Sequence, residues 1–132
     1  MSIDFDSLAT AAHDGRNKLG EAAFVRAASE IDAWYFVGVA PPEAPDEPEP
    51  LVAAIANEPH LLVFTEHARA ESFATRRAGQ RGGEAIVLEM TPAEALGYAE
   101  MMLEHGVTGL HFNDGDHAVG VPIRRALDIA QG

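Results

Sequence analysis

The chain of 132 residues contains no cysteine. Disulfide bonds, thiolate metal sites and a cysteine nucleophile are therefore excluded, whereas the compartment is not constrained, because cytosolic proteins need no cysteine. Long hydrophobic runs are also missing, since no stretch approaches the roughly 20 apolar residues that cross a bilayer. The start of the chain, Met1 to Asp6, is already acidic and does not have the pattern of a secretion signal. We expect a cytoplasmic protein that does not enter the membrane.

Positive charge is scarce. Nine Lys and Arg residues stand against 21 Asp and Glu residues, which gives a formal net charge of −12. A surface of this sign repels phosphate backbones and anionic lipids. We therefore expect neither nucleic acid nor a membrane surface as a partner.

The charges are also unevenly distributed, because no Lys or Arg occurs between Ala27 and Ala68. This asymmetry indicates either two solvated faces or a dipolar interaction surface. In the second case a protein partner is expected, or self-association in which the acidic segment of one copy meets the arginines of another. The candidate interaction residues are the arginines Arg69, Arg76, Arg77 and Arg81 and the acidic residues Asp46, Glu47 and Glu49.

Proline is concentrated in residues 41–50, where five prolines alternate with acidic residues. Proline removes backbone donors and fixes φ, and like charges repel, so this segment cannot join the interior of a sheet and is expected to be an extended, mobile acidic loop. It could also serve as a docking peptide, although no P-x-x-P core with a flanking arginine is present. A solvated connection is the simpler interpretation.

Hydrophobic periodicity divides the rest of the chain into helices and strands. Apolar residues at three- and four-residue spacing predict helices over 5–13, 20–31, 66–77, 92–105 and 123–130. Strands are predicted over 34–40, 51–56, 60–64, 85–90, 109–112 and 118–122. This order predicts an α/β (α+β) domain over residues 20–132, preceded by a helical extension over 1–19. Helices should pack against a mixed sheet of about five or six strands.

Capping signals define several helix ends. Thr91 to Glu94 has the sequence of a capping box, with Pro92 at the first helical position. The helix that begins there is expected to cross over the sheet. The helix over 66–77 is predicted to be capped by Thr65 at its start and to end at Gly79.

Two stretches have the composition of hairpin turns. The first, 57–59, separates two apolar runs, which predicts an antiparallel pair. The second, 113–116, reads Asn-Asp-Gly-Asp and predicts a two-residue hairpin loop before the last strand.

These features, in this order, resemble the N-terminal domain family of SseB, named for enhanced serine sensitivity, over about residues 20–130. The residues that carry the resemblance are Leu62, Val63, Phe64, Thr65, Gly106, Val107, Gly109, Leu110, Asn113 and Gly115. The family commonly has Asn-Pro-Gly where this chain has Asn113-Asp114-Gly115. The resemblance implies an α/β domain of poorly defined biochemistry without an agreed catalytic residue set, so no active site is carried over.

Histidines and carboxylates surround the turn at 111–117. His111, Asp114, Asp116 and His117 are of the residue types that bind divalent metals. A turn explains the Asn-Asp-Gly-Asp sequence by itself, however, and the spacing is not that of an EF-hand. We therefore predict no bound metal or cofactor and keep these four residues as candidates for a small-molecule or divalent-metal site.

Two other groups are interpreted as structural. His60 and His67 flank an apolar strand, but no nucleophile motif such as G-x-S-x-G accompanies them, which favours surface histidines over an acid and base pair. Trp34, Tyr35 and Phe36 are consecutive in an apolar strand, which favours core packing over a ligand pocket.

Taken together, these patterns predict a protein-interaction or accessory module that is not an enzyme. The alternative is a small-molecule or divalent-metal-binding regulatory domain that uses the turn at 111–117.

Overall fold

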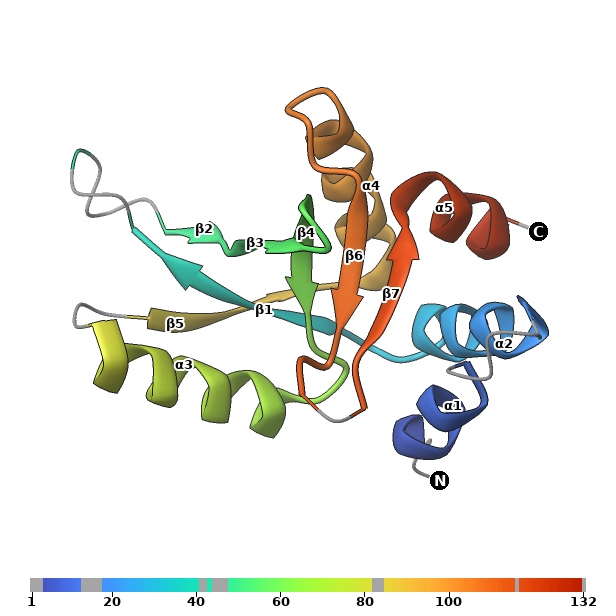
Figure 1. The fold of residues 1–132 in the computed structure, drawn as a ribbon, viewed down its shortest axis with the longest axis horizontal. Helices are drawn as coiled ribbons and strands as arrows, with labels where there is room; N and C mark the ends of the chain where they lie inside the picture. Colours follow the sequence, from blue (N-terminus) through green and yellow to red (C-terminus); the bar gives the residue numbers. More distant parts are fainter. Residues whose placement is uncertain are drawn as a thin grey trace.

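The computed structural model describes residues 4–12, 18–40, 43, 48–81, 85–115 and 117–131, without the side chains of 18, 19 and 78–81 (Figure 1). The helices are α1 (Phe5–Ala12), α2 (Lys18–Ser29), α3 (His67–Arg81), α4 (Pro92–Leu103) and α5 (Ile123–Gln131). The strands are β1 (Trp34–Val39), β2 (Glu49–Pro50), β3 (Val52–Ile55), β4 (Glu58–Val63), β5 (Ala85–Met90), β6 (Gly109–Phe112) and β7 (Val119–Pro122). No helix in these ranges is long and apolar enough to cross a bilayer.

The strands form two sheets, which cross each other in the view of Figure 1. Sheet A has the order β2-β1-β5, and sheet B has the order β3-β4-β6-β7. Only β4 and β6 pair in parallel among these strands; the other pairs are antiparallel. The predicted fold class, with helices packed on mixed β-structure, is confirmed. The described strands number seven and are divided between two sheets, whereas a single sheet of fewer strands was expected. Glu49 and Pro50, predicted to belong to the loop over 41–50, instead form the edge strand β2.

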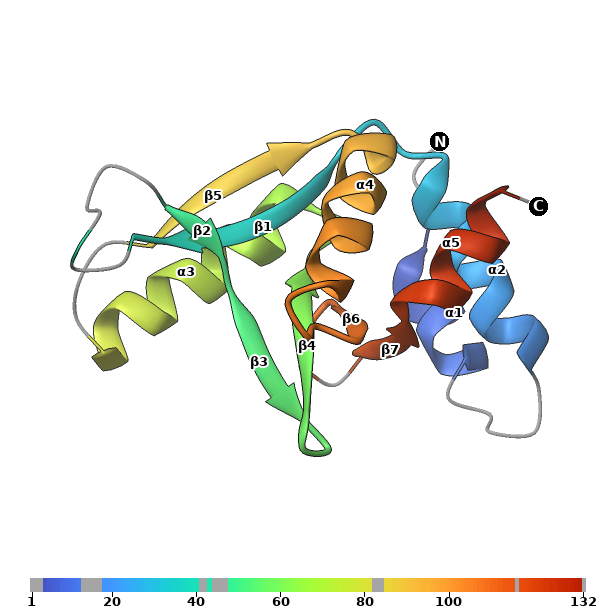
Figure 2. The ribbon, with the colours of Figure 1, turned by 90° about the horizontal axis from the view of Figure 1, so that it is seen from above.

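Two connections join the sheets. Tyr35 of β1 and Phe64, just after β4, exchange two backbone hydrogen bonds of 2.8 Å. Leu51 lies between β2 and β3; its N–H donates to Val37 O (2.9 Å) and its carbonyl accepts from Leu62 N–H (3.1 Å). One chain segment therefore pairs first with sheet A and then with sheet B, and Figure 2 shows it bending between β2 and β3.

Strand β1 is the central strand of sheet A, and its position follows from its composition. The sequence WYFVGV carries no charge and is aromatic and β-branched, which suits burial on both faces. Trp34, Phe36 and Val37 are fully buried, and Tyr35 is partly buried. The indole N–H of Trp34 donates to Ala28 O (2.7 Å), so its burial leaves no unsatisfied donor. The prediction that these aromatic residues belong to the core is confirmed.

The larger core lies between sheet B and four helices. Residues of α1, α2, α4 and α5 pack here against Leu61, Val63, Leu110 and Phe112 of the sheet. Phe24 of α2 packs edge-on against Phe5 of α1 and Phe112 of β6, with ring centroids 5.3 and 5.2 Å apart. The stretch 1–19, predicted as an extension, thus supplies side chains to the main core.

A smaller core lies on the opposite side, beneath α3. It consists of buried residues of both sheets and the helix: Val37, Leu62, Phe64, Ala70 and Ala74. Helix α3 continues past Gly79 to Arg81, so the prediction that Gly79 ends it was wrong. An interior glycine costs a helix only about 1 kcal/mol relative to alanine, and α3 also packs against β1 and β5.

Two predicted connections also differ. Strands β6 and β7 pair as expected, with Phe112 opposite Val119, but six residues (113–118) connect them instead of a two-residue loop. Helix α4 leads from β5 in sheet A to β6 in sheet B, so it connects two sheets rather than crossing over one. The residues between the parallel strands β4 and β6 therefore include α3, β5 and α4.

The hairpin of β3 and β4 is confirmed, and its turn yields a stability prediction. The two turn residues, Ala56 and Asn57, have φ of 52° and 68°, which is the left-handed conformation of a type I′ turn. Alanine is strained there, whereas glycine is not.

We expect Ala56→Gly to raise the free energy of unfolding by about 0.5–1 kcal/mol, because the relieved strain exceeds the entropy that glycine adds to the unfolded chain. Urea unfolding would measure this. Ala54→Gly, in the extended strand β3, is the matched control and should lower stability instead. Destabilisation by both variants would contradict the interpretation of the turn.

Candidate functional site

The carboxyl ends of the parallel strands β4 and β6 meet at one edge of sheet B, where polar sites commonly form in sheets of this kind. Thr65 follows β4 and Asn113 follows β6. The backbone N–H of Thr65 donates to Asn113 Oδ1 (3.0 Å), and Asn113 Nδ2 donates to Thr65 Oγ1 (2.9 Å). Asn113 N–H also donates to Val63 O (2.7 Å). Both side chains are buried, and we call this contact the Thr65–Asn113 clasp.

The clasp changes the roles predicted for its two residues. Asn113 has φ of 53°, a left-handed conformation that asparagine tolerates better than most residues. Helix α3 begins at His67, and the hydroxyl of Thr65 accepts a hydrogen bond from Asn113. The prediction that Thr65 caps α3 was therefore wrong: the residue connects two strand ends that lie 48 positions apart in the sequence.

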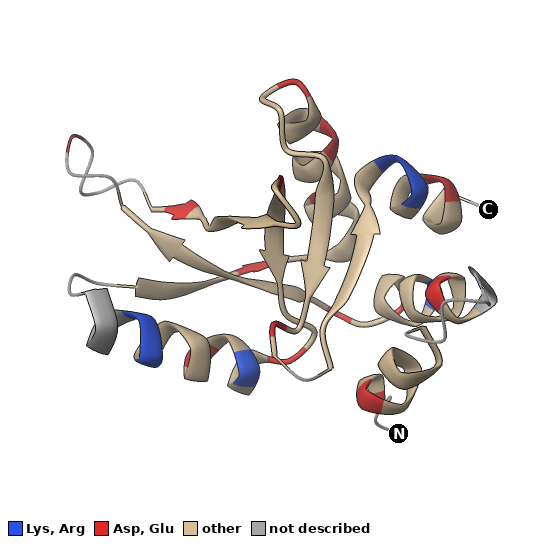
Figure 3. Cartoon of the chain, viewed as in Figure 1, with Lys and Arg blue, Asp and Glu red and all other residues tan. Residues whose placement is uncertain are grey.

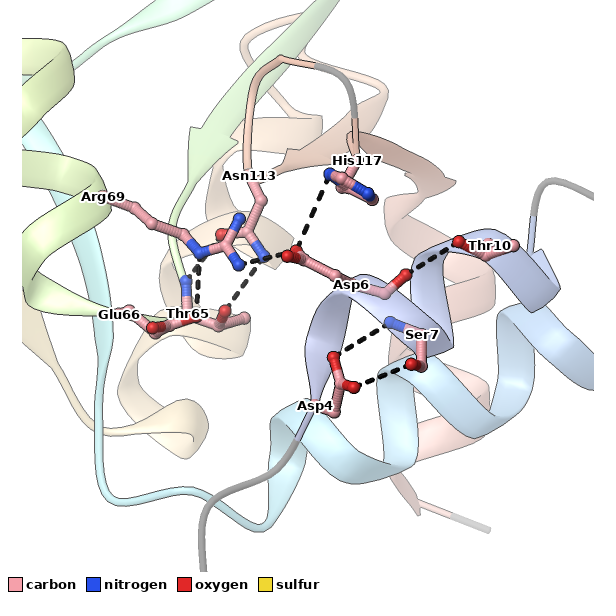
Figure 4. A network of polar contacts seen from close by, with 9 residues as sticks. All are labelled: Asp4, Asp6, Ser7, Thr10, Thr65, Glu66, Arg69, Asn113 and His117. Carbon is pink, nitrogen blue, oxygen red and sulfur yellow. Dashed lines mark hydrogen bonds and ion pairs between the residues drawn. The ribbon is translucent and has the colours of Figure 1, made fainter.

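Arg69 is held in a network of ion pairs beside the clasp (Figure 4). Its Nη2 lies 2.6 Å from Asp6 Oδ1 of α1, and its Nε lies 2.8 Å from Glu66 Oε1. His117 Nδ1 lies 3.9 Å from the same oxygen of Asp6. Burial lowers the Arg69 pKa, but the hydrogen bonds to Asp6 and Glu66 outweigh this effect and raise it. Arg69 thus connects α3 to α1 and already has two carboxylate partners.

Helix α1, which carries Asp6, has a cap that the sequence analysis did not predict. Asp4 accepts hydrogen bonds from the hydroxyl of Ser7 (2.7 Å) and from its backbone N–H (3.1 Å). Both bonds lower the pKa of Asp4, and the bond from the Ser7 hydroxyl has the larger effect. The sequence contains a signal for this cap: an aspartate at the start of an apolar stretch, three residues before a serine.

The three candidate metal ligands that the structure describes, His111, Asp114 and His117, do not come together. His111 Nε2 lies 2.9 Å from Asp114 Oδ1, whereas His117 faces Asp6. Asp116 lies outside the described residues. Within the described part of the chain, no group of three or more His, Asp or Glu side chains could hold a metal ion. What remains of this candidate site is the His111–Asp114 pair.

The other arginines of α3 line a pocket of about 320 Å³, which we call the α3 pocket. Its charged residues are Arg76, Arg77 and Asp114. Its remaining lining is apolar and comes from β3, β4, α3 and the residue before β3: Leu51, Val52, Ala53, Leu62 and Phe73. Arg76 lies over the ring of Phe73, with its guanidinium carbon 5.8 Å from the centroid. Two predicted sites, the arginine cluster and the turn at 111–117, therefore meet at one pocket.

The charges of this pocket are incompletely paired. Neither Arg76 nor Arg77 forms an ion pair with any carboxylate that the structure describes, in contrast to Arg69. Arg77 is partly buried, so its guanidinium is also partly removed from water. Figure 3 shows that basic residues are few on this acidic chain and that α3 carries them at two places. The α3 pocket can therefore accept an anionic group from outside.

The remaining predicted interaction residues lie elsewhere or are not described. Asp46 and Glu47 lie outside the described residues, as does the side chain of Arg81. Glu49 is exposed on β2 and lines a different hollow, beside Tyr98. Burial raises the pKa of the Tyr98 hydroxyl, and the charge of Glu49 raises it further.

Sequence reasoning missed the apolar lining of the pocket. Phe73, Arg76 and Arg77 are three and four residues apart, which places them on one face of a helix. That spacing was available as a signal, whereas the contribution of Leu51 and Leu62 depends on how the sheets are joined.

His60 and His67 are separate from the α3 pocket. His60 Nδ1 lies 2.9 Å from Glu58 O, and His67 Nδ1 lies 3.2 Å from Glu71 on the exposed face of α3. His67 also packs edge-on against the ring of Tyr35, with centroids 5.5 Å apart. Each histidine has a local contact that explains its position.

Asn113→Ala should lower the free energy of unfolding by about 2–4 kcal/mol, because it leaves the buried Thr65 N–H without an acceptor and places alanine at positive φ. Asn113→Gly should recover only about 1 kcal/mol, because glycine removes the strain but not the lost hydrogen bonds. Denaturant unfolding of both variants separates the two effects. If Asn113→Gly were as stable as the unmodified protein, the clasp would contribute nothing to stability.

Comparison of the chain with models of protein families and with curated proteins gave no match. The resemblance to the SseB N-terminal domain family therefore stays a prediction.

Proposed function

We propose that the protein is a non-enzymatic binding module that holds an acidic segment of a protein partner in the α3 pocket. The observation that supports this most directly is the pair Arg76 and Arg77, which line a partly apolar pocket and form no ion pair with any carboxylate that the structure describes. Arginine presents a planar set of donors that matches a carboxylate, and such pairs are stronger than hydrogen bonds between neutral groups. An acidic side chain of a partner would supply the missing charge.

The apolar lining adds a second requirement for the ligand. Leu62 is buried, Phe73 is partly buried and Val52 is 39% exposed, so the pocket offers apolar surface at its base and its edge. Apolar surface that a ligand covers contributes roughly 25 cal/mol per Å² to the favourable free energy of binding. The preferred segment therefore combines acidic and apolar residues.

The net charge of −12 does not prevent this interaction. Repulsion between exposed charges is largely screened beyond about 8–10 Å at physiological ionic strength. At contact distance the charges of the pocket lining matter most, and two arginines against one aspartate, Asp114, give this lining a net positive charge. Affinity should therefore fall as salt is added, as for any exposed ion pair.

A small-molecule ligand is the competing proposal for the same pocket. Its volume of about 320 Å³ lies at the lower end of the range of roughly 300–1,000 Å³ for drug-sized ligands. Asp114, which pairs with His111, adds a carboxylate to the lining. The resemblance to the SseB family, which implies no agreed catalytic residues, is compatible with either ligand.

Selection from a random peptide display library on the purified protein tests the proposal. Peptides that combine acidic and apolar residues should be enriched, and Arg76→Glu/Arg77→Glu should weaken their binding by at least about tenfold, equivalent to 1.4 kcal/mol. Arg26→Glu/Arg124→Glu changes the net charge equally at exposed positions of α2 and α5 and should leave binding nearly unchanged.

Equal losses in the two double variants would reduce the effect to net charge and contradict the proposal. Enrichment of peptides without acidic residues would also contradict it. If no peptide were selected but glutarate alone raised the melting temperature in an Arg77-dependent manner, the small-molecule alternative would replace it.

A further inference from the structure

Strand β3 is an edge of sheet B and lines the α3 pocket with its first residues. The hydrogen bond from Leu62 N–H to Leu51 O identifies 51 and 62 as a hydrogen-bonded pair. Because such pairs alternate in antiparallel strands, the pair Ala53 and His60 is the next one. Val52 and Ala54 therefore direct their backbone N–H and C=O groups away from β4. Pro59, which has no N–H, lies opposite Ala54 and fits this register.

The outer edge of β3 is short but is not protected by charge or by proline. Its sequence, VAAI, contains no charge and no proline, and no described strand pairs with its outer edge. Natural edge strands usually carry lysine, proline or a bulge, because free N–H and C=O groups otherwise recruit another strand. Figure 2 shows β3 and its hairpin at the margin of the molecule.

A hollow is present on each side of the chain at Val52. One is the α3 pocket, with its arginines; the other, about 370 Å³, is lined by Val52, Tyr98 and Met102 together with the end of β1 and with β2. Successive side chains of a strand point to opposite faces. A strand added beside β3 would thus direct alternate side chains toward the two hollows.

We infer that the partner segment binds by β-strand addition: an extended peptide with alternating acidic and apolar residues pairs with Val52 and Ala54 as a fifth strand of sheet B. Main-chain hydrogen bonds provide affinity, and the side chains provide specificity, as in other complexes of this kind. The acidic residues face Arg76 and Arg77, with the methylene groups of their side chains against the apolar lining of the α3 pocket, and the apolar residues face Tyr98 and Met102. This inference rests on the proposed function and specifies how the partner binds.

Charge complementarity favours a partner over a second copy of this chain at the same edge. Strand β3 has no acidic residue, so pairing of β3 with β3 would bring no strand carboxylate to Arg76 and Arg77. A peptide with acidic residues at every second position supplies the carboxylates that Arg76 and Arg77 would bind.

Ala54→Pro tests the mode of binding, because it removes an outward N–H while leaving the hydrogen bonds between β3 and β4 intact. Binding of the selected peptides should weaken by at least about tenfold. Ala54→Val keeps the N–H and should bind as the unmodified protein does. Thermal unfolding of both variants shows whether the hairpin is preserved.

Modified peptides give the same test without altering the protein. N-methylation at one alternating set of peptide residues should abolish binding, whereas methylation at the other set should not, because only one set donates to β3. Equal effects of the two sets would overturn strand addition even if Ala54→Pro failed to fold.

The outcomes distinguish this inference from the proposed function. Peptides that require Arg77 but bind equally to Ala54→Pro would refute strand addition and leave the proposed function standing. Peptides whose binding requires neither Arg77 nor the N–H of Ala54 would refute both strand addition and the proposed function. A dimer of the unmodified protein that Ala54→Pro converts to a monomer would make the second copy the occupant and overturn the inference.

Discussion

The Thr65–Asn113 clasp is the contact on which the arrangement of the other elements depends. It joins the carboxyl ends of the only described parallel strand pair, and both residues begin a change of chain direction. From Thr65 the chain enters α3, whose Arg69 pairs with α1. From Asn113 the chain turns toward β7 and α5. A buried polar pair of this kind is costly when broken and specific when satisfied, so it fixes the relative positions of segments on both sides of sheet B.

The second constraint is the corner between the two sheets. Because the segment from Glu49 to Ile55 pairs with β1 and then with β4, the sheets meet at Leu51. Helix α3 packs across this corner, and its length separates two groups of arginines. Arg69 and Arg76 are seven residues apart, or about 10 Å along the helix axis. One end of α3 is therefore tied to α1, while the arginines further along reach the pocket beside β3.

The proposed binding surface combines three features that are individually common. Arginines without an ion pair, a partly apolar hollow and an edge strand each occur in many proteins that bind no partner there. Here the corner between the sheets brings all three to the same place, beside residues 51–53. The positive charge of the arginines requires a negatively charged ligand, and the apolar lining requires hydrophobic contact. The open edge of β3 favours a ligand with an extended backbone.

The sequence alone determined the elements whose cause is local. The uncharged aromatic run specified β1, the capping box specified the start of α4, and two apolar runs around a turn specified the hairpin of β3 and β4. Periodicity did not show where α3 ends, because the helix continues through Gly79, and an interior glycine costs only about 1 kcal/mol. The tertiary structure alone decided that Thr65 pairs with Asn113, that the seven described strands form two sheets, and that Arg69 is paired while Arg77 lines a pocket. These outcomes depend on contacts between residues distant in the sequence, and such contacts leave no periodic pattern in the chain.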